Sequence, residues 1–166
     1  MAVLALRTHE FPLARALAYQ EQDCSLTLAQ GLAEYYRANG GRVLPPALLP
    51  PESAALFGSH DICHVIFGLD TTLEDEAMAD TRTLLSCDVG FARYSSYLAT
   101  NKHTQAIFKQ IGYDTILWGT LKTLPRMARA LREHFRMTKK WPWVPPESYQ
   151  QRTLAELRRE YGIRVI

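Results

Sequence analysis

The chain has 166 residues, which is enough for one domain and too short for two ordinary ones. Its residues are 47% hydrophobic and 22% charged, which is typical of a globular protein and excludes collagen-like, disordered and integral-membrane chains. Lys and Arg number 19 against 17 Asp and Glu, so the formal net charge of +2 speaks against a uniformly basic protein that binds nucleic acid. We expect a single domain over residues 1–166.

The three cysteines, Cys24, Cys63 and Cys87, are widely spaced and include no CxxC pair. This pattern suggests neither a disulfide framework nor a zinc ribbon, and a reducing compartment is the simpler interpretation. The apolar run of residues 1–6 is shorter than the roughly 7–15 residues of a signal peptide, and no stretch approaches the ~20 apolar residues of a membrane-spanning helix. We expect a cytoplasmic protein, with peripheral contact on the inner face of a membrane left open.

Apolar residues recur at helical spacing in the first half of the chain. They predict a helix through residues 28–36 that stops at the Asn-Gly-Gly of residues 39–41. A proline-rich connector follows, and Pro51 suits the first turn of a second helix. We expect that helix to continue through Ile66 and to stop at Gly68.

A third start signal lies at Thr71-Thr-Leu-Glu74, which fits a capping box between a threonine hydroxyl and a glutamate. The pattern predicts a helix from about Thr72 that bends near Gly90 and runs to about Thr100.

The second half of the chain also favours helices. We expect helical stretches over 103–118 and 121–137, then a loop over 141–146, then a last helix that stops at Gly162. No alternating strand run and no internal repeat is found, so the sequence predicts an all-α, single-domain bundle of six or seven helices. The expected breaks between the middle helices are Gly112, Gly119 and Pro125.

The most informative segment is His60-Asp61-Ile62-Cys63-His64, inside the second predicted helix. Residues four apart on a helix share one face, so His60 and His64 could both direct ring nitrogens at one metal ion. Asp61 lies about 100° further round the helix, where it could be a ligand or could orient one. Two histidines at this spacing also occur without any metal, as partly buried polar residues.

A third ligand could come from the next helix. Five acidic residues and no Lys or Arg lie between Asp70 and Asp80, and two helices joined by a short loop pack antiparallel. Two imidazoles with carboxylates suit Zn²⁺ or Fe²⁺, while Mg²⁺ or Mn²⁺ would fit a set richer in carboxylate and water. An acidic cluster is otherwise a solvated helix start. Cys63 is either a soft ligand or, as we favour, a small buried hydrophobe.

His60-Asp61, then His64, then eleven intervening residues and Glu76 resemble the signature of the ubiquinone (coenzyme Q) biosynthesis protein Coq-four family. Gly68 and the threonines that follow it match the same pattern. Near the end of the chain, Trp143 and the segment 147–163 resemble the closing segment of that family. The resemblance is strongest over residues 56–163 and indicates a divergent bacterial member.

This resemblance implies an all-helical protein of quinone biosynthesis, with His60, Asp61, His64 and Glu76 around one divalent metal, zinc being favoured. It implies a prenylated, ring-carboxylated quinone precursor as ligand, met at a membrane surface. The family's two suggested roles both remain open. One is a catalyst that removes the ring carboxylate with oxidation at the same carbon, for which Asp61 and Glu76 would be catalytic. The other is a non-catalytic, lipid-binding organiser of other quinone-biosynthesis enzymes.

An isoprenoid tail would need an apolar slot between helices. Phe108, Ile111, Trp118 and Leu121 belong to an apolar set at helical spacing and are our candidates for lining it. The same residue types would equally form an ordinary core, and the sequence does not separate the two.

Residues 121–143 carry seven Lys and Arg against the single acid Glu133. An apolar stripe of Leu121, Leu124, Ala128, Leu131 and Phe135 runs beside the cations, and such helices suit an anionic membrane surface or head group. The alternative is a solvated helix packed by its apolar stripe. We expect no nucleic acid, since no recognition module accompanies the patch. The predicted contacts are Arg126, Arg129, Arg136, Lys139, Lys140, Trp141 and Trp143.

One further alternative is an HD-type metal phosphohydrolase, prompted by His60-Asp61. That class needs a separate upstream histidine, for which His9 is a distant candidate, and gives His64 no role. Assembly as a homodimer is left open.

Overall fold

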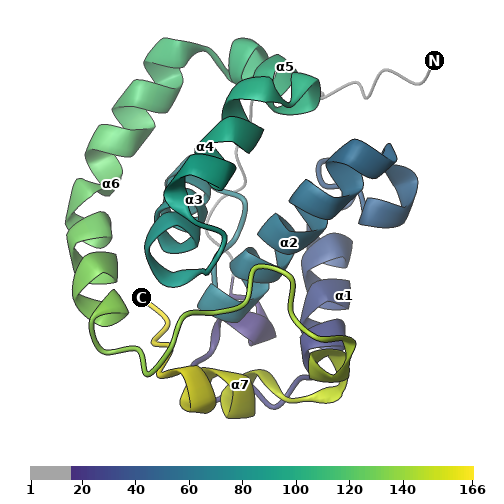
Figure 1. Ribbon diagram of the computed structural model, residues 1–166, viewed down its shortest axis with the longest axis vertical. Coiled ribbons are helices and arrows are strands. Elements are labelled where there is room, and N and C mark those ends of the chain that lie inside the picture. Colours follow the sequence, from purple (N-terminus) through teal and green to yellow (C-terminus); the bar gives the residue numbers. More distant parts are fainter. Residues whose placement is uncertain (1–15) are drawn as a thin grey trace.

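The computed structural model describes residues 16–166, apart from the side chains of Glu52, His103 and Ile107. Within that part the chain is all-helical, with seven α-helices, three short 3-10 turns and no strand (Figure 1). The predicted fold class is therefore confirmed. The apolar run of residues 1–6 and His9, the ligand that a phosphohydrolase would need, lie outside the described residues.

Helices α1 (Leu28–Ala38) and α2 (Pro51–Phe67) follow the predicted pattern closely. The Thr27 hydroxyl accepts a hydrogen bond from the backbone of Gln30 and caps α1, as expected for threonine before a helix. The end of α2 is set by Gly68, whose φ of 72° is a left-handed conformation that residues with a Cβ disfavour.

Helix α3 (Leu73–Ser86) begins with a different cap from the one predicted. Thr72 is the capping residue, and its hydroxyl accepts a hydrogen bond from the Asp75 backbone at 3.1 Å. The predicted box between Thr71 and Glu74 is thus wrong by one position. The Thr71 hydroxyl instead donates to Asn39 at 2.7 Å, which ties the start of α3 to the end of α1.

The predicted long helix with a bend near Gly90 is two helices, α3 and α4 (Phe91–Thr100). The chain is extended at Cys87 because its neighbours pair with a distant loop. The Asp88 amide donates to the Trp141 carbonyl at 3.0 Å, and the Trp141 amide donates to the Ser86 carbonyl at 2.8 Å. This backbone pairing joins Ser86 to Trp141, which are 55 residues apart in the sequence. It replaces the hydrogen bonds that would continue the helix.

Helices α5 (Lys102–Ile111) and α6 (Tyr113–His134) are separated by Gly112, as predicted. The two other expected breaks are wrong, since Gly119 and Pro125 both lie inside α6. A Cβ at Gly119 would overlap the side chain of Leu73, so glycine allows α6 to approach α3 closely. Pro125 removes the donor that would bond the Leu121 carbonyl, but both residues are exposed and water can replace it.

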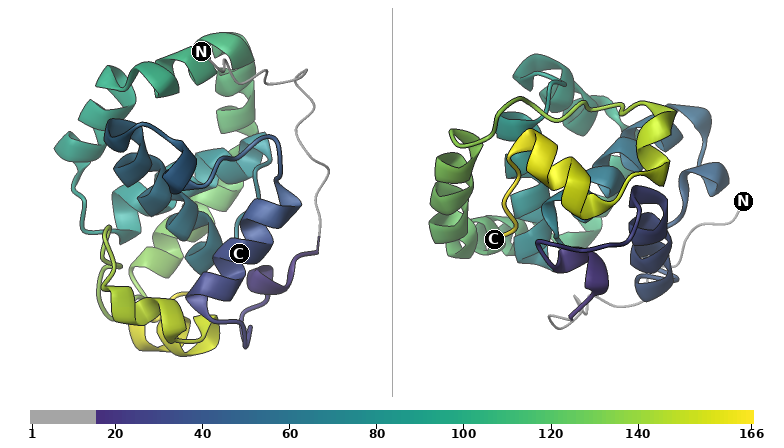
Figure 2. Two further views of the ribbon diagram at one scale, coloured as in Figure 1. Left: turned by 90° about the vertical axis from the view of Figure 1, so that its right-hand side faces the viewer. Right: turned by 90° about the horizontal axis from the view of Figure 1, so that it is seen from below.

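The last helix, α7 (Leu154–Tyr161), ends at Gly162 as predicted. It lies beside the first described segment of the chain (Figure 2). The buried guanidinium of Arg158 donates to four backbone carbonyls, those of Tyr19, Glu21, Val65 and Ile66. These bonds fix α7 to the first described segment and to the C-terminal end of α2. The second half of α2 is thereby held at the centre of the fold.

Trp141 and Trp143 lie in the core, with 0% and 4% of their surfaces exposed. The Trp141 ring packs against Tyr161 with 4.9 Å between ring centroids, and the Trp143 ring packs against Tyr94 at 5.6 Å. The prediction that these two tryptophans contact a membrane is therefore wrong. The backbone pairing with Ser86 and Asp88 draws their loop inward.

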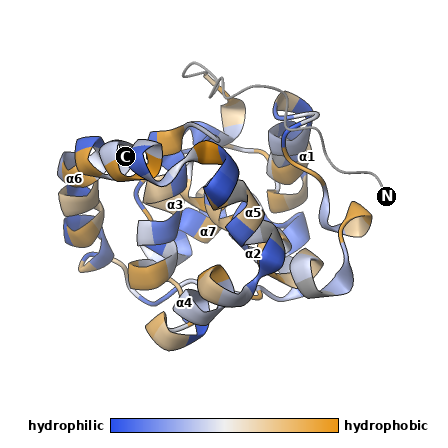
Figure 3. Ribbon diagram, turned by 90° about the horizontal axis from the view of Figure 1, so that it is seen from above, coloured by the Kyte–Doolittle hydropathy of each residue, from blue (hydrophilic) through white to orange (hydrophobic). Residues whose placement is uncertain are grey.

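Helix α6 packs along α3 and occupies one edge of the molecule, away from α1 and α2 (Figure 1). Coloured by hydropathy, it carries both apolar and polar residues along its length (Figure 3). In the part of the chain that the structure describes, none of the helices combines the length and the apolar character needed to cross a membrane.

Candidate metal centre

Three side chains, those of His60, His64 and Glu76, converge where α2 faces the first turn of α3. The two histidine Nε2 atoms are 3.1 Å apart, and each lies 3.4 Å from Oε2 of Glu76. The helical spacing of the histidines and the short loop at Gly68 produce this arrangement, as the sequence predicted. The group could hold a metal ion, with one ligand atom from each residue.

The dimensions of this triangle suit a small divalent ion. Ligands at the ~2.0–2.1 Å bond lengths of tetrahedral zinc stand about 3.3 Å from one another. The three observed separations of 3.1, 3.4 and 3.4 Å bracket that value. Two imidazoles and one carboxylate also form a donor set that zinc and ferrous iron accept, with a further position left for water or a ligand. The residues present therefore fit a metal of the predicted kind.

His64 is oriented for this role by its surroundings. Its Nδ1 lies 2.9 Å from the carbonyl oxygen of Asp70, which can only accept, so the proton is on Nδ1 and the lone pair of Nε2 is directed at the group. The Tyr35 ring stacks on the imidazole with 5.4 Å between centroids. His64 is fully buried, so both contacts restrict its ring to one orientation.

His60 is held through a longer chain of contacts. Its Nδ1 lies 3.3 Å from the hydroxyl of Tyr94, and that hydroxyl donates to Oδ1 of Asp80 at 2.5 Å. The sequence pattern included Asp80 only as one acid of a cluster, although its position four residues after Glu76 indicates the same helix face. The pattern did not indicate that Tyr94 belongs to the site. Tyr94 lies on α4, which is positioned by the long-range backbone pairing of Ser86 and Asp88 with Trp141.

Asp61 does not join the group, which corrects its prediction as a metal ligand and as a catalytic residue. Its carboxylate accepts hydrogen bonds from Tyr36 at 2.9 Å and from Tyr35 at 3.4 Å, both on α1. The turn of about 100° from His60 directs it toward α1, whereas Glu76 approaches from α3. Burial raises the pKa of Asp61 to about 6, against the opposing effect of the two histidines.

The charges of the group are strongly coupled. Burial lowers the pKa of His60, but the hydrogen bond and negative charge of Glu76, with Asp80 and Asp61, raise it to about 9. Burial raises the pKa of Glu76, and the two histidines lower it by more, to well below its usual range. Without a metal, the carboxylate is thus ionised and holds a proton on the histidine pair. An ion would take the place of that proton.

Cys63 lies beside the group and turns away from it. Its Sγ is 3.6 Å from Sγ of Cys87, and both side chains are fully buried. Cys63 therefore matches the favoured interpretation as a small buried hydrophobe and is not among the converging ligand atoms.

Arg126 was predicted to meet a membrane or a head group, and the structure gives it another role. Its guanidinium donates to Oδ1 of Asp75 at 2.8 Å, which links α6 to the first turn of α3 next to Glu76. Oδ2 of the same carboxylate accepts from the Asp70 amide at 3.1 Å. This pair braces the loop that carries the carbonyl contacting His64.

The predicted apolar slot is only partly assembled. Phe108 and Ile111 are half-buried on α5, but Trp118 and Leu121 are 65% and 43% exposed on the outer side of α6. The prediction that these last two line an internal slot is wrong, because Gly119 and Thr123 form the side of α6 that packs on α3.

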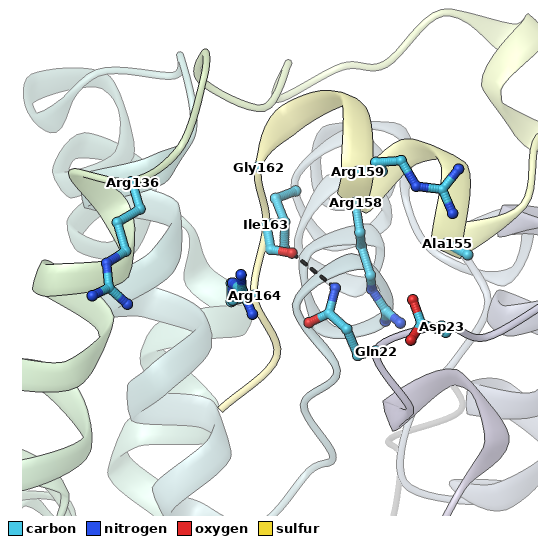
Figure 4. Close-up of a pocket in the computed structure, with 9 residues that line it drawn as sticks. All are labelled: Gln22, Asp23, Arg136, Ala155, Arg158, Arg159, Gly162, Ile163 and Arg164. Carbon is cyan, nitrogen blue, oxygen red and sulfur yellow. Dashed lines mark hydrogen bonds between the residues drawn. The ribbon is translucent and has the colours of Figure 1, made fainter.

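A cavity of about 630 Å³ lies elsewhere, between the end of α6, α7 and the C-terminal segment (Figure 4). None of the metal-group residues borders it. Arginines dominate its lining, and Asp23 is its one carboxylate; the lining residues are Gln22, Asp23, Arg136, Ala155, Arg158, Arg159, Gly162, Ile163 and Arg164.

The chain was compared with known proteins at three levels. No family model, no curated protein and no solved structure matches it. The family resemblance drawn from the motif residues therefore stays a prediction. The geometry of His60, His64 and Glu76 is an independent observation and does not depend on it.

Proposed function

We propose that this chain is a metal-dependent protein that acts on a quinone precursor. The observation that carries the proposal is the convergence of His60, His64 and Glu76 on one point between α2 and α3. The spacing of these residues is also the part of the sequence that resembles the Coq-four family. The proposed ligand is a prenylated, ring-carboxylated precursor, and the favoured metal is zinc, with iron, manganese and magnesium as alternatives.

In this proposal the chain's own residues hold the site and manage its protons. A bound divalent ion supplies Lewis acidity toward a carboxylate or phenolate oxygen. His60, His64 and Glu76 bind it, and the Asp70 carbonyl and Tyr94 fix the rings of the two histidines. Asp80, linked to His60 through the hydroxyl of Tyr94, takes the proton-handling role that the sequence suggested for Asp61.

The proposed reaction replaces the ring carboxylate with a hydroxyl group on the same carbon. The carboxylate leaves as carbon dioxide, the hydroxyl oxygen comes from water, and the two electrons released reduce one dioxygen molecule to hydrogen peroxide. The alternative is a non-catalytic organiser, in which the metal only fastens α2 to α3. The two differ in whether substrate is consumed.

The phosphohydrolase alternative receives no support from the site. That class would use Asp61 as a ligand and leave His64 without a role. In the structure Asp61 is bonded to tyrosines of α1, and His64 is at the centre of the group.

Metal analysis tests the first part of the proposal. We expect about one divalent ion per purified chain, and its loss in His64→Ala, since two remaining ligands bind weakly. His134→Ala, a histidine at the end of α6 outside the group, is the matched control and should keep the metal. A wild-type protein that holds no metal before and after reconstitution would refute the proposal.

Turnover tests the second part. Metal-loaded protein is incubated with dioxygen and a prenylated, ring-carboxylated precursor, and carbon dioxide and hydroxylated product are measured. We expect product with wild type and none with Glu76→Ala whose helical content is unchanged. Bound metal with no turnover in wild type would favour the organiser.

A further inference from the structure

The outer face of α6 is the most exposed apolar surface that the structure describes. Seven of the ten large hydrophobic residues with high exposure lie on α6 or on its C-terminal cap. Their exposed fractions range from 43% to 78%. Soluble proteins rarely leave a contiguous apolar patch of this kind uncovered, and such patches mark interaction sites.

Six of these residues, all but Trp118, form one continuous line along the helix together with the exposed Ala128. Their spacing of three and four positions places them within one narrow arc, which we call the outer stripe. The opposite side of α6, which includes Gly119, Thr123 and Ala130, is buried against the rest of the protein. The outer stripe consists of Tyr113, Leu117, Leu121, Leu124, Ala128, Leu131 and Phe135.

Cations border the outer stripe along one side. They are exposed. With a rotation of about 100° per residue along an α-helix, they lie about 20–100° round the helix axis from Leu121. Among the described residues, the acid that pairs with them is Glu133, which is buried and lies 2.9 Å from Arg136 and 3.5 Å from Arg132. We call this set, which consists of Lys122, Arg129, Arg132 and Arg136, the basic rim.

The basic rim continues onto the C-terminal segment. Arg136 borders the cavity between α6 and α7, and Arg159 and Arg164 border the same cavity (Figure 4). Both of these arginines are exposed, and no carboxylate lies within ion-pair distance of either in the described structure. The positive charge thus extends beyond α6 onto the lining of this cavity.

We propose that α6 lies in the plane of an anionic lipid bilayer, with the outer stripe in the boundary between head groups and acyl chains and the basic rim against lipid phosphates. A helix of 22 residues is about 33 Å long and offers its stripe over that whole length. The charge decides between occupants of this face. Two copies of the chain meeting there would offer each other cations without matching acids, whereas anionic lipid supplies the complementary charge.

The proposal differs from the contacts predicted from sequence and stands apart from the proposed function. Arg126, Trp141 and Trp143 have no part in it, because Arg126 is paired with Asp75 and both tryptophans are buried. Tyr113 and Leu117, which are 71% and 58% exposed, extend the apolar stripe that the sequence indicated. Neither the metal group nor turnover is involved, so the test below is independent of both.

The test is flotation of the full chain with vesicles of phosphatidylcholine alone or with phosphatidylglycerol added. We expect wild type to float with the anionic vesicles and weakly with the neutral ones, and salt to reduce the binding. The double variant Leu121→Ser with Leu124→Ser should lose binding by about tenfold or more, and so should Arg129→Glu with Arg132→Glu.

Matched controls separate this effect from general changes of surface or stability. Leu48→Ser with Val144→Ser removes two apolar residues outside α6 that are even more exposed, at 69% and 71%. Arg37→Glu with Lys102→Glu reverses two exposed cations on other helices. Both should bind within about twofold of wild type. Circular dichroism and thermal unfolding confirm that each variant is folded.

Three results would overturn the proposal. Wild type could fail to float with anionic vesicles, or the control variants could lose as much binding as the stripe and rim variants. Light scattering could also show that wild type is a dimer that does not float, and that the variant Leu121→Ser with Leu124→Ser is a monomer. That result would assign the outer stripe to a second copy of the chain.

Discussion

The hydroxyl of Tyr94 stands between two charged groups, with Oδ1 of Asp80 at 2.5 Å and Nδ1 of His60 at 3.3 Å. It therefore connects a buried carboxylate to the ring of a proposed metal ligand. Residues that orient a metal-binding histidine in this way tune metal affinity without touching the ion. Tyr94 lies on α4, outside the two helices that carry the ligands.

Tyr94→Phe should weaken metal binding by about 10–100-fold while leaving the fold intact, because only the hydroxyl is removed. Competition with a metal-binding dye measures the affinity directly. Tyr97→Phe, one helical turn further along α4, removes a hydroxyl that contacts Arg93 and should leave the affinity unchanged. Equal affinities for wild type and Tyr94→Phe would show that the contact does not orient His60.

The stability of the metal-free protein should depend on pH through His60. Because its folded pKa is raised to about 9 from an ordinary value of 6.5, the stabilisation is fully present below pH 6.5 and is lost as the pH rises through about 9. Bound metal replaces the proton, so the metal-loaded protein should not lose stability over this window. Urea unfolding at several pH values, with chelator and with zinc, measures the difference.

His60→Gln provides the control for this pH dependence. It removes the titrating ring, so in chelator the loss of stability between pH 6.5 and about 9 should shrink. Identical pH profiles for wild type and His60→Gln in chelator would contradict the assignment.

Gly119→Ala should destabilise the protein by about 1–2 kcal/mol, although alanine is the better helix former. The added Cβ would overlap Leu73 at the start of α3, so the two helices would have to separate. Thermal unfolding measures the loss. Gly40→Ala is the control, since its nearest neighbour would be 3.6 Å away, and no loss beyond about 0.5 kcal/mol is expected there.

Arg158→Met should lower the free energy of unfolding by more, about 3–5 kcal/mol, because it leaves buried carbonyls without hydrogen-bond donors. The exposed neighbour Arg159 offers a matched control, and Arg159→Met should change the free energy of unfolding by less than about 0.5 kcal/mol. Similar urea midpoints for the two variants would mean that the Arg158 bonds contribute little.

The sequence predicted those parts of the site that depend on short-range rules. The spacing of His60 and His64, the stop at Gly68 and the short turn before Glu76 all act within a few helical turns, and their joint result was foreseeable. The direction of Asp61 was not. Helical geometry gives its angle from His60, but only the tertiary fold decides that α1 lies on that side.

The same limit explains the errors in the second half of the chain. An apolar stripe at helical spacing fits both a helix that packs through it and a helix that exposes it, and Leu121, which was expected to line an internal slot, is 43% exposed. The opposite error was made for Trp141, whose neighbours in sequence are cations. Its burial depends on backbone pairing with Ser86, which no local pattern reveals.

The position of Arg158 has a consequence for the order in which the protein can fold during synthesis. Its guanidinium bonds to the Ile66 carbonyl across 92 positions of the chain. Helix α2, which carries His60 and His64, is therefore synthesised well before its C-terminal carbonyls acquire these donors. A nascent chain can form the α2–α3 hairpin early, but it reaches its final rigidity only after α7 has left the ribosome.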